Sequence, residues 1–250
     1  MDFPDYSAHE WLLAILAGLC AGFSKAGLAG IGMLSVMLMA QLIPGKASSG
    51  AVLPLLIFAD IMAAAIFRQQ ILWSPIRRLA VPVFAGILIG FFILRPLPDA
   101  AFKPVVGWMV LGMLTLQVVR HYRPALTEGL PHSATFLWAV GLLTGISTMI
   151  ANAAGPIATI YLLLLGLPKK EFIATMAWLF LFVNLAKVPF SLALGLLSAE
   201  SLLLNVALLP AVVAGLCAGR WFIERLPPRP FMWIVMTFAA FSAVKLIWWP

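Results

Sequence analysis

Two glycine-rich interruptions of apolar sequence, at residues 23–32 and 147–156, contain the side chains best suited to bind a ligand. In a membrane protein, unwound backbone at membrane depth is tolerated only where it is buried in protein or lines an aqueous cavity. The N–H groups and the positive helix end at such a break attract an anion. The alternative is that the glycines only let helices pack closely. The candidate anion-binding residues in the two breaks are Ser24, Lys25, Gly27, Gly30, Gly32, Ser147, Thr148, Asn152 and Gly155.

A second set of candidates lies on one face of the apolar stretch 172–194. Asn184, Lys187 and Ser191 are spaced i, i+3 and i+7, so they share a helix face. An ionisable side chain inside the bilayer costs at least about 2.5–3.5 kcal/mol and usually faces a cavity or a partner. We therefore add Asn184 and Lys187 to the candidate substrate site. The alternative for Lys187 is that its long side chain reaches the membrane interface.

Asp60 is the one acid that lies well inside an apolar segment, and it aligns with Asn184 of the later stretch. Three roles are open for it. It carries a coupling proton, it pairs with a lysine, or it lies near the following loop and pairs with Arg68.

The composition places all these residues in a polytopic membrane protein. The chain has 250 residues, of which 63% are hydrophobic and 10% charged, whereas a soluble domain carries roughly 25% charged residues. Apolar stretches separate clusters of charge, as in membrane-spanning helices. The net charge is +7, and the Lys and Arg residues that produce it lie mainly in short loops. This location indicates the topology of the membrane protein rather than a nucleic-acid partner. The ten expected segments are 11–25, 28–43, 47–67, 76–94, 103–121, 134–150, 155–166, 172–194, 202–221 and 231–249.

Four of these segments, the first two and the sixth and seventh, are short and interrupted by Gly or Pro. They are either short spans or paired half-helices that enter the membrane and return. The acidic start, without a basic region, argues against a cleaved signal peptide, so the first helix is expected to stay in the mature protein.

An internal repeat divides the chain into residues 1–125 and 134–250. The motif Gly18-Leu-Cys-Ala-Gly22-Phe-Ser24 returns 123 residues later as Gly141-Leu-Leu-Thr-Gly145-Ile-Ser147, and Ala85-Gly86-Ile-Leu-Ile-Gly90 returns 129 residues later as Ala214-Gly215-Leu-Cys-Ala-Gly219. For these four Gly-x-x-x-Gly pairs, close helix packing is the better interpretation. The ordered series predicts two homologous halves within one membrane domain.

The charges in the loops predict that the two halves are inverted. The loop at 68–78 is basic while its counterpart near 195–201 is not, and the next pair of loops reverses this relation. If basic loops face the cytoplasm, the halves have opposite orientations and both termini lie outside. Lys46 would then lie on the outer side of the membrane, contrary to the rule that basic residues favour the cytoplasmic side. Inverted repeats are an architecture that many secondary transporters use, with the site between broken helices.

The sequence lacks the residue patterns that are typical of metal-binding proteins, nucleotide-binding proteins and hydrolases. The three histidines are scattered, Cys20 and Cys217 lie in apolar stretches without a CxxC motif, and there is no P-loop or nucleophile elbow. We therefore expect no metal site, no cofactor, no bound nucleic acid and no enzyme activity.

The repeated Gly-x-x-x-Gly-x-Ser motif, the glycine-rich break after it and the overall length together resemble the sulfite exporter TauE/SafE family. Members typically have a run of glycines after the Ser and a Gly-Thr-Ser-like stretch at the start of the following helix. Here those positions read Gly27-Leu-Ala-Gly30-Ile-Gly32 and Ser48-Ser49-Gly50, with Ala153-Ala154-Gly155 and Ala174-Thr175 in the second half, which indicates a divergent member. The resemblance implies transport of sulfite, sulfonates or related organosulfur anions, usually outward.

Together these observations predict an all-α secondary transporter of a small anion, in the bacterial inner membrane, that works by alternating access. Its partners would be the anionic substrate and the lipid bilayer, and a homodimer is left open. The alternative function is a non-transporting membrane subunit that assembles or scaffolds a partner complex.

Overall fold

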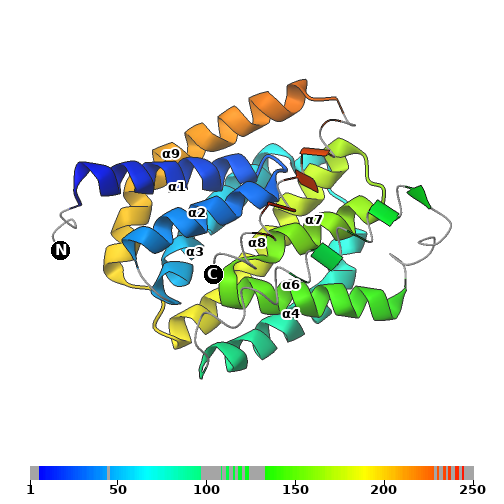
Figure 1. Ribbon diagram of the computed structural model, residues 1–250, viewed down its shortest axis with the longest axis horizontal. Helices are drawn as coiled ribbons and strands as arrows, with labels where there is room; N and C mark the ends of the chain where they lie inside the picture. Colours follow the sequence, from blue (N-terminus) through cyan, green and yellow to red (C-terminus); the bar gives the residue numbers. More distant parts are fainter. Residues whose placement is uncertain are drawn as a thin grey trace.

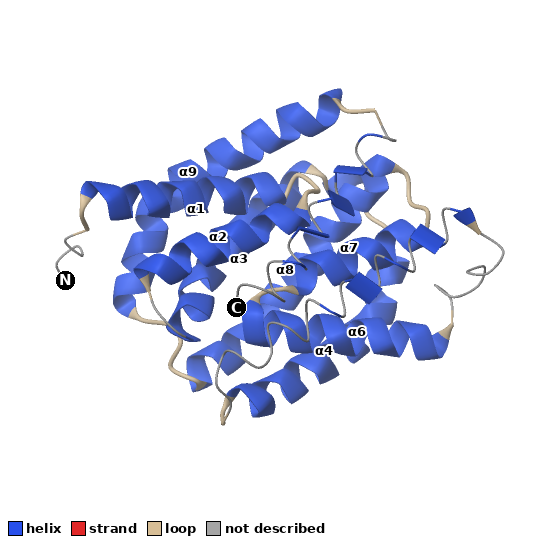
Figure 2. Ribbon diagram, in the orientation of Figure 1, coloured by secondary structure: helices blue, strands red, loops and turns tan. Residues whose placement is uncertain are grey.

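The computed structural model describes residues 6–43, 46–96 and 133–227, together with single positions between 108 and 123 and between 230 and 244. Within these residues the protein is helical and contains no strand (Figures 1 and 2), which confirms the all-α prediction. The expected segments 103–121 and 231–249 fall largely outside the described residues. The helices are α1 (Ala8–Ser24), α2 (Ala29–Leu42), α3 (Lys46–Ile66), α4 (Trp73–Leu94), α6 (Ala134–Ala151), α7 (Ala154–Leu164), α8 (Lys169–Ala193) and α9 (Ala199–Arg225), with a short 3₁₀ helix at Arg68–Gln70.

Serine side chains start three of these helices. Ser7 caps α1 and exchanges hydrogen bonds with Glu10 in a capping box, and Ser198 does the same with Ser201 at the start of α9. Ser133 accepts a bond from the Phe136 amide at the start of α6. Such caps satisfy backbone N–H groups that have no partner inside the helix, so they fix where a helix begins.

Helix length separates spanning helices from shorter ones. Four helices, α3, α4, α8 and α9, are long and apolar enough to cross a membrane. By contrast, α2 and α7 have 14 and 11 residues, which gives lengths of about 21 and about 17 Å against a hydrocarbon core of about 30 Å. The two short helices follow the two glycine-rich breaks, as expected for the interrupted segments.

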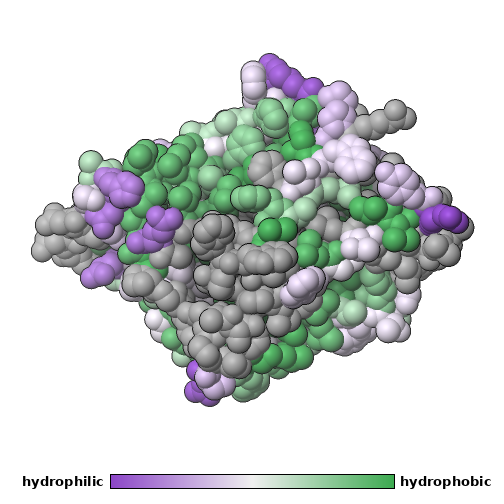
Figure 3. All heavy atoms as spheres, in the orientation of Figure 1, coloured by the Kyte–Doolittle hydropathy of each residue, from purple (hydrophilic) through white to green (hydrophobic). Residues whose placement is uncertain are grey.

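Much of the described outer surface is apolar. Figure 3 shows hydrophobic side chains over much of the described part of the visible face and hydrophilic ones mainly at its edges. Large exposed hydrophobic side chains include Val81 and Phe92 on α4 and Val206 on α9, at 65%, 59% and 63% exposure. A water-facing surface rarely carries so many such residues side by side, whereas lipid tails accommodate them.

Glycines allow α1 to pack against α9 and α4 against α6, and each pair lies side by side in Figure 1. A Cβ atom added at Gly22 would overlap the carbonyl oxygen of Val212, and one at Gly145 would overlap that of Val83. The same holds at Gly215 against Leu19. The packing interpretation of the four Gly-x-x-x-Gly pairs is therefore confirmed.

These two helix pairs correspond residue by residue. Gly22 meets Val212 in one pair and Gly145 meets Val83 in the other. The glycines are separated by 145 − 22 = 123 positions and the valines by 212 − 83 = 129 positions, the two offsets of the sequence repeat. The first helix of each repeat thus packs on the fourth helix of the other. The inverted orientation of the halves stays a prediction.

The end of α9 is held by a lysine from α8. The Lys169 ammonium donates to the carbonyl oxygens of Ile223 and Leu226, the latter at 2.6 Å. We expect Lys169→Met to increase hydrogen exchange in the last turn of α9 about tenfold or more, because charged hydrogen bonds to the terminal carbonyls contribute about 1.5–3 kcal/mol. Exchange measured by mass spectrometry checks this. The control is Lys170→Met at the exposed neighbouring lysine, and equal exchange in both variants would contradict the prediction.

Candidate functional site

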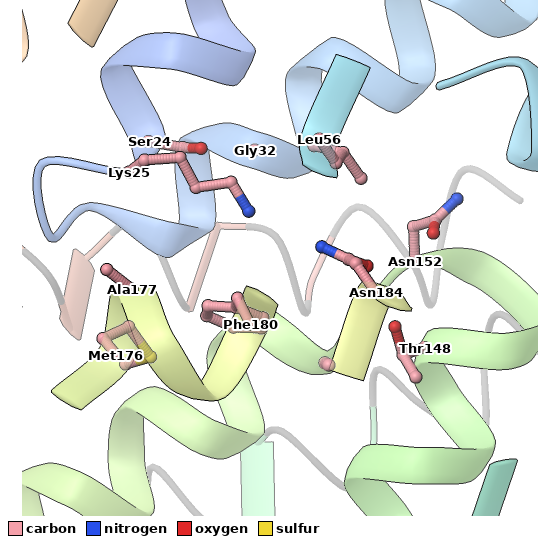
Figure 4. Close-up of a pocket in the computed structure, with 12 residues that line it drawn as sticks. Ser24, Lys25, Gly32, Leu56, Thr148, Asn152, Met176, Ala177, Phe180 and Asn184 are labelled. Atoms are coloured by element: carbon pink, nitrogen blue, oxygen red, sulfur yellow. The ribbon is translucent and has the colours of Figure 1, made fainter. Parts of the chain in front are cut away.

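The two glycine-rich breaks lie at one small cavity of about 40 Å³. This volume holds a few water molecules or a small ion. Figure 4 shows the first break, with Ser24, Lys25 and Gly32, facing Asn184, Asn152 and Thr148 across the cavity. The two breaks, which are more than a hundred residues apart in sequence, therefore lie together in the folded chain. The lining residues are Ser24, Lys25, Gly32, Leu56, Thr148, Asn152, Ala154, Gly155, Met176, Ala177, Phe180 and Asn184.

The first break is the tight turn between α1 and α2. Gly27 adopts φ 114°, a conformation that side chains strongly disfavour. The amides of Gly27 and Leu28 both donate to the carbonyl oxygen of Ser24, at 3.2 and 3.0 Å. The chain therefore reverses directly after Lys25 and leaves that side chain at the cavity. Gly32 lies so close to Ser24 that an added Cβ atom would be 3.2 Å from its hydroxyl oxygen.

The second break is the turn between α6 and α7. Asn152 has left-handed backbone, φ 51° and ψ 31°, and closes the end of α6. The amides of Asn152 and Ala153 donate to the carbonyl oxygens of Thr148 and Ser147, at 3.1 and 3.2 Å. This pattern is a Schellman-type end, in which asparagine is the usual alternative to glycine. Helix α7 begins two residues later with its first turn at the cavity.

Both short helices direct their N-terminal ends to the site. Gly32 belongs to the first turn of α2, and Ala154 and Gly155 begin α7. Within the described structure, no side chain makes a capping hydrogen bond at either N-cap residue, Leu28 or Ala153. A helix N-terminus without a side-chain cap favours an anionic ligand.

A buried ion pair supports the first break. The Lys25 ammonium lies 2.8 Å from Oδ1 of Asp60, whose side chain has no exposed surface. Asn184 donates from Nδ2 to Oδ2 of the same carboxylate at 2.6 Å. The Lys25 ammonium also lies 4.9 Å from the centre of the Phe180 ring, within range of a cation–π interaction. Of the three roles open for Asp60, the pairing with a lysine is confirmed.

A second polar chain supports the other break. Lys187 is 1% exposed and donates to Oδ1 of Asn152. Asn152 in turn donates from Nδ2 to the carbonyl and hydroxyl oxygens of Ser49, at 3.0 and 2.9 Å. The alternative that Lys187 reaches the membrane interface is wrong, because its ammonium points inward to an asparagine at the cavity.

The structure assembles most of the candidate residues but not all. Ser24, Lys25, Gly32, Thr148, Asn152, Gly155 and Asn184 line the cavity, and Asp60 and Lys187 contact lining residues. Gly27 and Ser147 are not among its described lining residues, and the Ser147 hydroxyl donates to the Thr144 carbonyl at 3.1 Å instead. Gly30 lies outside the residues whose surroundings the structure describes.

Several residues of the site were not predicted. Four apolar side chains, Leu56, Met176, Ala177 and Phe180, form part of the wall. They have no sequence signal, because apolar residues fill the whole stretch around each of them. Ser49 had a signal, since it lies in the Ser48-Ser49-Gly50 stretch at the start of α3 that corresponds to a polar family motif.

The arrangement is suited to binding rather than to bond making. Its lining combines one ammonium group, hydroxyl and amide groups and a helix N-terminus, all of which are able to donate hydrogen bonds to an anion. In the described part of the chain, no three His, Cys, Asp or Glu side chains come together where they could hold a metal ion. Cys20 and Cys217 are both free thiols.

Replacing Asn152 separates its backbone role from its side-chain role. Asn152→Gly keeps the left-handed conformation, whereas Asn152→Ala is strained there by about 1 kcal/mol. We expect the glycine variant to unfold at the higher temperature and both variants to bind anions at least about tenfold more weakly, because the contacts to Lys187 and Ser49 are lost. Thermal unfolding with and without anion checks this. Wild-type affinity in either variant would contradict it.

The family comparison agrees with this geometry. The family described as Sulfite exporter TauE/SafE matches residues 14–246, a range that includes both breaks, the cavity and the two glycine-packed helix pairs. No curated protein and no solved structure matches the chain. The match covers nearly the whole of the 250 residues, so the chain is a multi-pass membrane transport protein that belongs to the sulfite exporter TauE/SafE family.

Proposed function

We propose that this protein is a secondary transporter that exports a small anion, such as sulfite, a sulfonate or another organosulfur anion, across the bacterial inner membrane. The single observation that carries the proposal is the cavity where Lys25 from the first break and the start of α7 from the second meet. A cation and a helix N-terminus at one small, mostly buried space form an anion site. The family name supplies the sulfur chemistry.

We propose alternating access by two helical bodies. The first consists of α1, α2, α3 and α9, which share a core that includes Ala17, Leu55 and Leu208. The second consists of α4, α6, α7 and α8, whose larger core also takes in Ala26, Leu28 and Ile31 from the first break. These bodies differ from the two sequence halves, because α4 and α9 each pack against the other half. The anion cavity lies at their contact, where rocking of one body would open it to one side at a time.

Disulfide cross-links test which surfaces move. Ala63 on α3 and Ala177 on α8 pack in one small cluster at the contact between the bodies. In a background with both native cysteines replaced by alanine, we expect oxidised Ala63→Cys/Ala177→Cys to stop flux and reduction to restore it. The matched control is Gly18→Cys/Ala211→Cys, which links α1 to α9 inside one body, where a Cβ at Gly18 lies 3.1 Å from that of Ala211. Loss of flux on oxidation of both pairs would contradict the assignment of the bodies.

Asp60 is proposed to couple transport to protons. It is fully buried, it pairs with Lys25, and it contacts Asn184, the residue at the equivalent position of the other repeat. Protonation of the carboxylate would break its ion pair with Lys25, so we place proton uptake in the anion-free step of the cycle, while Asp60 stays ionised when the anion is bound.

Flux into proteoliposomes tests the proposed function. The purified chain is reconstituted, and uptake of radiolabelled sulfite and methanesulfonate is followed against vesicles without protein. We expect protein-dependent, saturable uptake that unlabelled substrate competes. Absence of uptake for every small anion, together with copurification of a stable partner protein, would replace the proposal with a non-transporting membrane subunit.

A further inference from the structure

We infer that the cavity is matched to a singly charged anion and discriminates against a doubly charged one, an inference that rests on the proposed anion site. The buried charges at the cavity do not balance. Lys25 and Lys187 each carry a formal positive charge and Asp60 carries one negative charge, so the cluster has one formal positive charge in excess.

Because the three side chains are buried, the excess positive charge acts strongly on an anion in the cavity. The side chains of Lys25 and Asp60 are 9% and 0% exposed, and Lys187 is 1% exposed. Water therefore does little to screen these charges, and charge interactions are strong where water is excluded. The rest of α2, α6 and α7 contributes no charged side chain, and the remaining charges of α1 and α8 lie near their N-terminal ends. The three side chains thus set the formal charge around the cavity.

The helix ends do not change this balance. Each break holds the C-terminal end of one helix and the N-terminal end of the next, namely α1 with α2 and α6 with α7. The partial negative charge of the first end offsets the partial positive charge of the second at each break. The N–H groups of α7 therefore orient the anion, while the lysines and Asp60 decide how much negative charge is compensated.

An entering anion loses its hydration, and that cost rises with the square of its charge. One excess positive charge compensates a single negative charge. A dianion would bring a second charge into a wall that includes the apolar side chains of Leu56, Met176 and Phe180, where an unpaired charge is costly.

Methanesulfonate and sulfate test the inference because both are tetrahedral sulfur anions of similar size. At about pH 6, the first carries one negative charge and the second carries two. We expect the solubilised wild-type protein to bind methanesulfonate at least about tenfold more tightly in calorimetry, the equivalent of about 1.4 kcal/mol. Equal affinities, or tighter binding of sulfate, would overturn the inference.

Two charge variants make the test independent of shape. Asp60→Asn adds one formal positive charge, so the preference for methanesulfonate should fall at least about tenfold or reverse. The double variant Asp60→Asn/Asn184→Asp restores the charge with the carboxylate moved to its neighbour, and the wild-type preference should return. A purely structural role of Asp60 as the partner of Lys25 predicts no such return. If thermal unfolding shows that Asp60→Asn is folded, an unchanged ratio of the two anion affinities would overturn the inference. If the variant does not fold, the ratio measured on the wild-type protein decides the inference.

The two proposals fail differently. If wild-type protein binds neither anion and neither raises its unfolding temperature, both the proposed anion site and its charge preference are overturned. If it binds and transports anions without regard to their charge, the charge preference alone is overturned.

Discussion

Gly22→Ala and Gly145→Ala are each expected to lower the free energy of unfolding by about 3 kcal/mol or more. At both positions the added methyl group would overlap a backbone carbonyl oxygen of the facing helix, Val212 or Val83. Backbone cannot move aside as a side chain can, so the helices must separate, and overpacking of this kind costs at least as much as the usual range for cores. The measurement is the thermal unfolding midpoint of the purified variants.

Gly112→Ala is the matched control. Among the described atoms, none lies within 4 Å of a Cβ atom built at Gly112. The same substitution there should leave the midpoint unchanged or raise it, because alanine favours a helix by about 1 kcal/mol over glycine. If Gly22→Ala unfolds at the same temperature as Gly112→Ala, the close packing of α1 on α9 is contradicted.

Lys25→Ala is expected to abolish anion-dependent flux and to destabilise the protein. It removes the charged side chain that lines the cavity and leaves the fully buried Asp60 carboxylate without its cation. Breaking a buried pair from one side costs about 3–5 kcal/mol. The double variant Lys25→Ala/Asp60→Asn should recover much of the stability, because no unpaired charge stays behind, but it should not recover flux.

Proteoliposome flux and thermal unfolding of these two variants and wild type separate the effects. Recovery of both stability and flux in the double variant would mean that the pair is structural. Equal flux of wild type and Lys25→Ala would remove Lys25 from the site.

The positions of the breaks could be predicted from sequence because their causes are local. Glycine at position 27 and asparagine at position 152 are residue types that tolerate positive φ, and both adopt it. The expected segment 155–166 corresponds to α7, which runs from Ala154 to Leu164. The glycine spacing also predicted close helix packing at these motifs, but not which helices pack together, which only the structure shows.

The partners of the polar side chains could not be predicted, because they depend on how distant helices cross. Asp60 was open to three roles until the packing of α1 against α3 placed it beside Lys25. Asn152 bonds Ser49 across 103 positions of sequence, which no local pattern encodes. Lys187 lies near the outer end of its apolar stretch in sequence, and only the tertiary contact with Asn152 shows that it points inward.

The apolar wall of the cavity was also beyond sequence reasoning. Phe180 and Met176 lie in a stretch where almost every residue is apolar, so periodicity does not separate a lipid-facing side from a cavity-facing side. Their place follows from the crossing of α3 and α8 near Asp60 and Asn184, the two equivalent residues of the repeats, which are joined by a hydrogen bond.

The most direct test of the central claim is to locate the anion. Crystals of the protein soaked with selenite, the selenium analogue of sulfite, would reveal its position by anomalous scattering. The anion site proposed here predicts one strong peak between the Lys25 ammonium and the first turn of α7 at Ala154 and Gly155, and loss of that peak in Lys25→Ala/Asp60→Asn. A second pocket, near the end of α9, is lined in part by Lys170 and Arg220. A peak confined to that pocket, or the same central peak in the double variant, would contradict the proposed site.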